Sequence, residues 1–179
     1  YKLTELGREN NVDICFDAEE ADRLNLSLFI FKEIIESKLI DEKYQGFGFA
    51  VQAYQKRAFF VLDWLKKYLS EVNKKINIRL VKGAYWDTEI KVAQEQGFID
   101  YPVFTKKFAT DISYLACAQK LYDNVNVFSQ FATHNAHSIS YIKTLFKDRD
   151  FEFQKLHGMG DEIYSYLEKD ENFKCRVYA

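Results

Sequence analysis

The sequence predicts an α/β protein whose parallel sheet forms an incomplete (βα)₈ barrel of the TIM type. Short, almost continuously apolar segments alternate with amphipathic helical patterns along the chain, which indicates a parallel sheet covered by helices. Every apolar segment ends in a polar or aromatic residue, which favours a barrel because its active site lies at the carboxyl ends of its strands. A complete barrel takes about 250 residues and eight strands, so this chain of 179 residues is expected to form part of one.

Six segments are expected to form strands, because each is a short apolar run bounded by polar or turn-forming residues. Their carboxyl ends meet at one edge of a parallel sheet. In chain order the segments are residues 12–17, 48–52, 76–82, 127–134, 151–157 and 174–178, and they end in Asp17, Gln52, Lys82, His134, His157 and Tyr178.

Helices are expected between these strands and would connect them by right-handed crossovers. In residues 59–72, Phe60, Leu62, Leu65 and Leu69 lie among Lys and Glu at helical spacing. The expected helices are residues 26–37, 59–72, 88–96, 112–122 and 139–146.

An open, doubly wound sheet is the competing parallel architecture. Such a sheet normally carries a glycine-rich phosphate turn of the form Gly-x-Gly-x-x-Gly, and this sequence has none. The polar strand ends therefore favour the barrel.

The composition indicates one folded domain over residues 1–179, without an internal boundary. With 47% hydrophobic and 17% aromatic residues, the chain can bury a large core, and it contains no linker-like tract. The net charge of -2 argues against nucleic-acid binding, and no apolar stretch reaches membrane-spanning length.

The first residue and the cysteines indicate what kind of protein the chain comes from and in which compartment it folds. It opens with Tyr1 rather than Met, so we expect a piece of a longer protein. Cys15, Cys117 and Cys175 are widely spaced and odd in number, which predicts packing roles, a reducing cytoplasm, and neither a disulfide framework nor structural zinc.

The turn after the third expected strand is the clearest candidate for chemistry. Arg79 offers a planar fork of donors, Lys82 a point charge, and Gly83 room for close approach of a ligand to the backbone. In a regular strand Arg79 and Val81 face one side and Lys82 the other, so these side chains line one site together only if a bulge intervenes.

Seven different motifs follow one another along the chain in a specific order and spacing. They are residues 17–23 (DAEEADR), 52–57 (QAYQKR), 79–90 (RLVKGAYWDTEI), 101–103 (YPV), 133–137 (THNAH), 151–160 (FEFQKLHGMG) and 175–179 (CRVYA). Together they closely resemble the proline dehydrogenase domain of the bifunctional bacterial proline-utilisation flavoproteins. The resemblance covers essentially the whole chain.

The resemblance implies an FAD-dependent barrel that oxidises L-proline to 1-pyrroline-5-carboxylate and passes electrons to a membrane quinone. It also implies a cytoplasmic parent protein that is peripherally associated with the inner membrane and carries an aldehyde dehydrogenase domain. This chain would supply strands three to eight. A lysine-bearing second strand would precede Tyr1, and a last helix with paired arginines for the proline carboxylate would follow Ala179. We therefore expect the isolated chain to bind proline poorly and to be inactive.

The resemblance also assigns roles to single residues around the substrate. Arg79 matches a residue beside flavin N5. Asp17, which by itself would be interpreted as a helix cap, matches a member of the active-site network. Tyr85, Leu156 and Tyr178 match residues that wall the proline ring, a role that suits their apolar surfaces.

Further positions are expected to contact FAD. Val81, Lys82 and Gly83 can offer backbone and charge to the pyrophosphate. Thr105, Lys106 and Lys107 form a second candidate phosphate site before the next helix. The complete set implied for the cofactor is Asp17, Gln52, Arg79, Val81, Lys82, Gly83, Thr105, Lys106, Lys107, Thr133 and His134.

Two rival interpretations remain. His134, His137 and His157, with Asp17, could bind a divalent metal in a barrel hydrolase or lyase. Alternatively, the piece is a non-catalytic scaffold. An incomplete barrel would expose sheet edges and apolar helix faces, so self-association of the isolated chain is expected.

Overall fold

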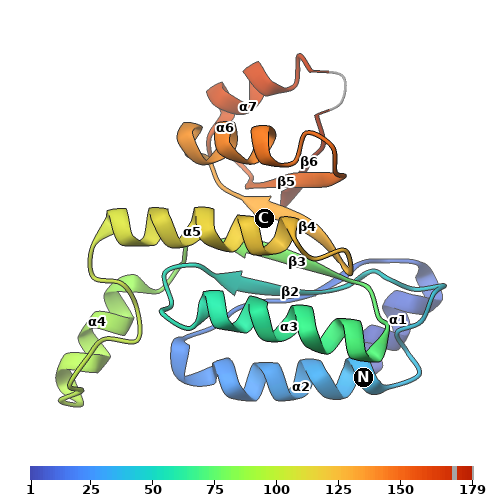
Figure 1. Cartoon of the computed structure of the whole chain (residues 1–179), viewed down its shortest axis with the longest axis horizontal. Helices are drawn as coiled ribbons and strands as arrows, with labels where there is room; N and C mark the ends of the chain where they lie inside the picture. Colours follow the sequence, from blue (N-terminus) through green and yellow to red (C-terminus); the bar gives the residue numbers. More distant parts are fainter. Residues whose placement is uncertain (171–172, 179) are drawn as a thin grey trace.

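Six parallel strands form one curled sheet in the computed structural model, which describes residues 1–170 and 173–178 (Figure 1). The strands are β1 (Ile14–Phe16), β2 (Phe47–Gln52), β3 (Ile76–Val81), β4 (Val127–Ala132), β5 (Phe151–Leu156) and β6 (Cys175–Tyr178). Their spatial order follows the chain, and every neighbouring pair is parallel. The predicted strands are thereby confirmed, and the strand order shows no reversal of the kind that marks a doubly wound sheet. Ala179, the last residue of the C-terminal motif, lies outside the described residues.

The five expected helices are present, and two further helices were not expected. The helices are α1 (Lys2–Asn10), α2 (Leu24–Glu36), α3 (Ala58–Val72), α4 (Trp86–Glu95), α5 (Lys107–Tyr122), α6 (Ala136–Leu145) and α7 (Asp161–Leu167), with a 3₁₀ turn at Ala21–Arg23. Helix α5 begins five residues before the expected 112–122, and Phe108 in its first turn is exposed. Within the described residues, no helix is long and apolar enough to cross a membrane.

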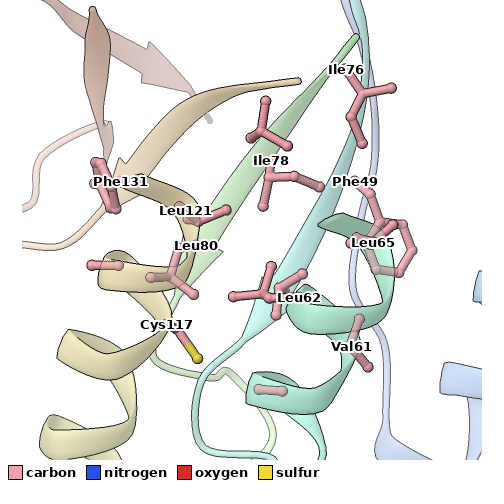
Figure 2. Close-up of a cluster of buried hydrophobic side chains, with 14 of the residues drawn as sticks. Phe49, Val61, Leu62, Leu65, Ile76, Ile78, Leu80, Cys117, Leu121 and Phe131 are labelled. Carbon is pink, nitrogen blue, oxygen red and sulfur yellow. The ribbon is translucent and has the colours of Figure 1, made fainter. Parts of the chain in front are cut away.

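Helices α2, α3, α5, α6 and α7 cover the outer face of the sheet, where the main core lies. Along β3, Ile76, Ile78 and Leu80 are buried, whereas Arg79 and Val81 are partly exposed on the opposite face. Figure 2 shows the buried strand residues packed against side chains of α3 and α5, including Leu62, Leu65, Cys117 and Leu121. The inner face of the sheet is thus free to carry polar groups.

A cluster of aromatic rings anchors the last part of the sheet. Phe131 of β4 lies 4.9 Å from Phe146, measured between ring centroids, and Phe146 lies 5.3 Å from Phe151 of β5. Tyr164 of α7 is buried, and its hydroxyl donates to the carbonyl of Thr133 at 2.6 Å. These contacts fix α6 and α7 against the strand ends.

The three cysteines, Cys15, Cys117 and Cys175, are free. Burial raises the pKa of the Cys15 and Cys117 thiols to about 11. Both thiols are therefore protonated near neutral pH, in keeping with packing roles.

Gly83 is required by a contact within the chain. Its φ of 144° suits glycine, and a Cβ at this position would lie 2.4 Å from Cγ of Tyr54. The Tyr54 hydroxyl also accepts a hydrogen bond from the Tyr85 backbone N–H at 3.3 Å. The close approach expected for a ligand at Gly83 is thus made by the Tyr54 ring, which supports the turn after β3.

The segment between β1 and α2 is held from two sides. Oε1 of the buried Glu89, on α4, accepts from the backbone N–H of Ala21 at 2.6 Å. The Arg57 guanidinium donates to the carbonyl of the same residue. Burial raises the pKa of Glu89, and the nearby charges of Asp22 and Glu20 add to that shift.

Replacing Gly83 by Ala should lower the free energy of unfolding by about 2 to 5 kcal/mol, because backbone strain and a steric clash with Tyr54 add together. Gly97→Ala is the matched control, since Gly97 has φ 65° but its added Cβ would meet nothing within 4 Å. That control should cost only about 1 kcal/mol. Urea unfolding of the two variants measures both values, and equal losses would contradict the role given to Tyr54.

Glu89→Gln should make the protein at least as stable as the wild type at pH 8. The pKa of Glu89 is raised in the folded state, so its contribution to stability is greatest below its unfolded value near 4.5 and falls as pH rises through the folded pKa. The neutral amide keeps an acceptor for the Ala21 N–H and removes this loss. Thermal midpoints measured from pH 4 to pH 8 should therefore fall less steeply in the variant.

Two controls separate charge from hydrogen bonding at this position. Glu89→Ala removes the acceptor and should cost about 1 to 3 kcal/mol at every pH. Glu95→Gln alters an exposed carboxylate on the same helix and should change little. If the thermal midpoint of the Glu89→Gln protein fell with pH as steeply as that of the wild type, Glu89 would not be the titrating group.

Candidate active site

A cavity of about 590 Å³ lies at the carboxyl ends of the strands. Because all six strands are parallel, residues far apart in the sequence meet at this edge. Of the residues expected at the site, Asp17, Gln52, Arg79, Val81, Lys82, Gly83, Tyr85, Lys107, Thr133, His134, Leu156 and Tyr178 line the cavity. Thr105 and Lys106 are not among its lining residues, and Lys106 instead precedes the first turn of α5.

Arg79 is held by groups from three other strands or strand ends. Its Nε donates to Oε1 of Gln154 at 2.7 Å, and its Nη1 lies 3.4 Å from Oδ1 of Asp17. The guanidinium carbon is 4.8 Å from the ring centroid of Tyr178. Three residues expected to be catalytic, Asp17, Arg79 and Tyr178, are therefore brought together.

Asp17 does not act as a helix cap here. The residue that precedes the 3₁₀ turn is Glu20, and among the described residues Oδ1 of Asp17 accepts from the neighbouring Ala18 N–H, at 3.0 Å, and contacts Arg79. The geometry thus favours a role in orienting polar groups of the cavity.

Leu156 and Tyr178 are partners in the β5–β6 register, so their side chains lie next to each other on the inner face. Burial raises the pKa of Tyr178, which keeps its hydroxyl protonated near neutral pH. Tyr85 precedes α4 and also lines the cavity. Tyr85, Leu156 and Tyr178 thus all line the cavity, from the ends of β3, β5 and β6.

Lys82 and Lys107 form a positive corner of the cavity. Lys82 pairs with Asp111 of α5, and Nζ of Lys107 lies 2.6 Å from the other oxygen of the same carboxylate. These hydrogen bonds, first from Lys107 and then from Lys82, lower the pKa of Asp111. The corner thus combines two positive charges and one negative charge at the N-terminus of α5, where the helix dipole also favours anions.

No bulge is needed to explain how Lys82 reaches this corner. Strand β3 pairs continuously with both neighbours, and its side chains alternate regularly. Arg79 and Val81 face the inner side, while Lys82 follows the strand end and reaches Asp111 on α5. The cavity extends over both groups, which resolves the difficulty posed by strand alternation.

Gln52 links two loops at the rim of the cavity. Its Nε2 donates to the Glu19 carbonyl at 2.7 Å, and its Oε1 accepts from the Ala84 N–H at 3.0 Å. Its side chain is buried. The amide expected to contact a cofactor is thus engaged in holding the turn after β3 against the segment after β1.

Thr133 and His134 lie between β4 and α6. Oγ1 of Thr133 accepts from the backbone N–H of Asn135, whose own side chain caps α6 by accepting from Ser138 N–H at 3.0 Å. His134 lines the cavity, whereas His137 and His157 do not. In residues 1–170 and 173–178, no three His, Cys, Asp or Glu side chains are grouped so that they could hold a metal ion.

Gln154 is a cavity residue that sequence reasoning missed. It is 1% exposed and contacts Arg79 directly. Strand alternation could have identified it, because Gln154 lies two residues before Leu156 and therefore on the same face of β5. Asn135, Lys155 and Met159 also line the cavity and were not expected there.

Comparison with known proteins gives one consistent family. The family model described as proline dehydrogenase matches residues 1–179. The bifunctional protein PutA of Klebsiella aerogenes is 46% identical over 188 residues, which cover 99% of this chain and 14% of that protein. The chain therefore spans a small part of the curated relatives that it matches.

Solved structures agree with the sequence comparison. A variant of Bradyrhizobium japonicum proline utilization A is 44% identical, with a TM-score of 0.94 over 99% of this chain and 18% of that one. Proline utilization A from Bdellovibrio bacteriovorus inactivated by N-propargylglycine is 32% identical, with a TM-score of 0.90 over 99% of this chain and 19% of the other. This chain belongs to the proline dehydrogenase family.

Proposed function

We propose that this chain provides most of the active site of a flavin-dependent enzyme that oxidises L-proline to 1-pyrroline-5-carboxylate. The observation that carries the proposal is the firmly held guanidinium of Arg79 in the cavity, within a chain whose whole length matches the family. Oxidation removes a hydride from the ring carbon beside nitrogen, and FAD supplies the acceptor at flavin N5 when it is bound.

The donors around the cavity fit FAD. Lys82 and Lys107 offer positive charge to a pyrophosphate beside a helix N-terminus, and the backbone of Val81 and Gly83 belongs to the same turn. The inner face offers the fork of Arg79, and Asp17, Gln52, Thr133 and His134 lie on the cavity wall as further hydrogen-bonding groups. Thr105 and Lys106 do not line the cavity, so within residues 105–107 we propose a phosphate contact for Lys107 alone.

The chain's own residues position the substrate and stabilise charge in this proposal. Arg79 donates hydrogen bonds toward the place where negative charge develops, and its contacts fix it before the reaction. Tyr85, Leu156 and Tyr178 form an apolar wall for the proline ring. Family membership favours this oxidoreductase over the metal-dependent hydrolase.

Further cations are needed for the proline carboxylate. Among the described residues lining the cavity, each Lys or Arg is already paired: Arg79 with Asp17, Lys82 and Lys107 with Asp111, and Lys155 with Asp161. A carboxylate without its own cationic partner is costly to bury. We therefore propose that this chain is strands three to eight of the barrel and that the remaining barrel units supply those cations.

The wider setting follows from the family resemblance alone. We propose that the electrons pass to a membrane quinone, that the parent protein lies in the cytoplasm against the inner membrane, and that an aldehyde dehydrogenase domain accompanies this one. The relatives named bifunctional are consistent with a second enzyme. The strands β1 and β6 are the outer strands of the described sheet, so an isolated chain is expected to self-associate through its edges.

The decisive experiment is anaerobic addition of L-proline to the FAD-loaded parent protein, because the isolated chain is expected to be inactive. We expect the absorbance of oxidised flavin to bleach as the flavin is reduced. A colourless protein that contains stoichiometric zinc or iron would instead favour the metal-dependent hydrolase. Bound flavin that proline leaves oxidised would refute the proposed reaction.

Arg79→Met should slow flavin reduction by proline by about 10²- to 10³-fold, since a preorganised donor to developing charge is lost. Arg79→Lys should restore little of the rate because an ammonium lacks the planar fork that Gln154 and Asp17 hold. Stopped-flow absorbance measures the reduction, and FAD content is measured alongside. Wild-type reduction rates in Arg79→Met would contradict the role.

A further inference from the structure

A buried carboxylate lies on the inner face of the sheet, two residues before Gln154. Its residue, Glu152 of β5, has a side chain that is 11% exposed. Oε1 of Glu152 accepts from Nε2 of Gln130 at 3.1 Å, from Nε2 of Gln154 at 2.7 Å and from Nε of Arg176 at 2.9 Å. One charged oxygen thus collects donors from β4, β5 and β6.

This carboxylate determines which way the Gln154 amide points. An ionised carboxylate can only accept hydrogen bonds, and a guanidinium can only donate them. Gln154 lies between the two, so its NH₂ must face Glu152 and its carbonyl oxygen must face Nε of Arg79. The distances from Nε2 to Oε1 of Glu152 and from Oε1 to Nε of Arg79, both 2.7 Å, agree with this orientation. Because Gln154 is 1% exposed, water does not readily replace either partner.

The link through Gln154 is the firmer of the two polar contacts that orient Arg79. The alternative partner, Asp17, is 72% exposed and lies at 3.4 Å. An exposed ion pair at that distance is weak and is screened by water. The buried bond to Gln154 therefore holds the guanidinium beside the Tyr178 ring, whose centroid lies 4.8 Å from the guanidinium carbon.

We propose that Glu152 is a positioning residue for proline oxidation, which acts through Gln154 to fix the orientation of the Arg79 guanidinium. The proposal rests on the function proposed above for Arg79. Glu152 does not line the cavity at the strand ends, so its effect on the reaction passes through its neighbours. Gln130 of β4 and Arg176 of β6 also donate to the carboxylate and hold it in place.

The test uses the FAD-loaded parent protein, with each substitution made in this chain, and measures flavin reduction by proline under anaerobic conditions. Glu152→Gln replaces the carboxylate by a neutral amide that can donate as well as accept, so the orientation of the Gln154 amide is no longer fixed from the Glu152 side and its hydrogen bond to Arg79 is less firmly held. We expect the limiting rate of flavin reduction to fall by about 10- to 100-fold, with FAD content unchanged. Glu152→Asp keeps the carboxylate and should recover part of the rate.

A double-mutant cycle distinguishes positioning from a general structural role. If Glu152 acts through Arg79, adding Glu152→Gln to Arg79→Met should cause no further loss of rate. Gln154→Met removes the link to Arg79 but leaves the other partners of Glu152 in place. It should slow flavin reduction in the wild type and cause no further loss in Arg79→Met, which keeps the proposal testable if Glu152→Gln folds poorly. The proposal would be overturned if Glu152→Gln and Gln154→Met lowered the rate as much in the Arg79→Met background as they do in the wild type.

Asp13→Asn is the matched control. Asp13 accepts from Nη2 of Arg176 at 3.2 Å, so it touches the same network but lies off the path to Arg79. Its replacement should leave flavin reduction unchanged. Wild-type rates in both Glu152→Gln and Gln154→Met would refute the positioning role while the proposed function stands, whereas a wild-type flavin that proline does not reduce would refute the function itself.

Discussion

Regular alternation of side chains along parallel strands is the constraint on which the rest of this structure depends. On β3, Ile78 and Leu80 pack against the helices, while Arg79 and Val81 face the inner side. A shift of one residue would turn Arg79 into the apolar core and expose Leu80, so the buried face fixes the register. The packing seen in Figure 2 therefore also places Arg79 on the face that lines the cavity.

The two faces of the sheet contribute differently to the fold. The outer face buries aliphatic and aromatic side chains, whose burial provides most of the stability. The inner face also buries polar groups, which must satisfy one another, as Glu152, Gln154 and Arg79 do. Such hydrogen bonds add little net stability compared with apolar burial. Each donor must still face an acceptor, however, so these bonds determine how the polar side chains are oriented.

Features that depend on local sequence could be predicted, and features that depend on distant contacts could not. The strands and the face of Arg79 follow from alternation within a few residues. Helices α1 and α7 bury only two residues each, Thr4 and Gly7 in one and Tyr164 and Leu167 in the other, so few buried apolar side chains mark them in the sequence. The need for Gly83 comes from Tyr54 on another strand end, and the role of Gln154 comes from Arg79, 75 residues away.

Charge pairing explains why the positive groups of the cavity are both ordered and available. Asp111 bridges Lys82 and Lys107, which would otherwise repel each other at the start of α5. An anionic group entering this corner must compete with that carboxylate, but it meets a net positive charge and the positive end of a helix dipole. The side chain of Lys107 is 78% exposed, so turning it from Asp111 to an incoming anion costs little. Lys82, more deeply placed, keeps its contact with Asp111, so one lysine can anchor the corner while the other exchanges partners.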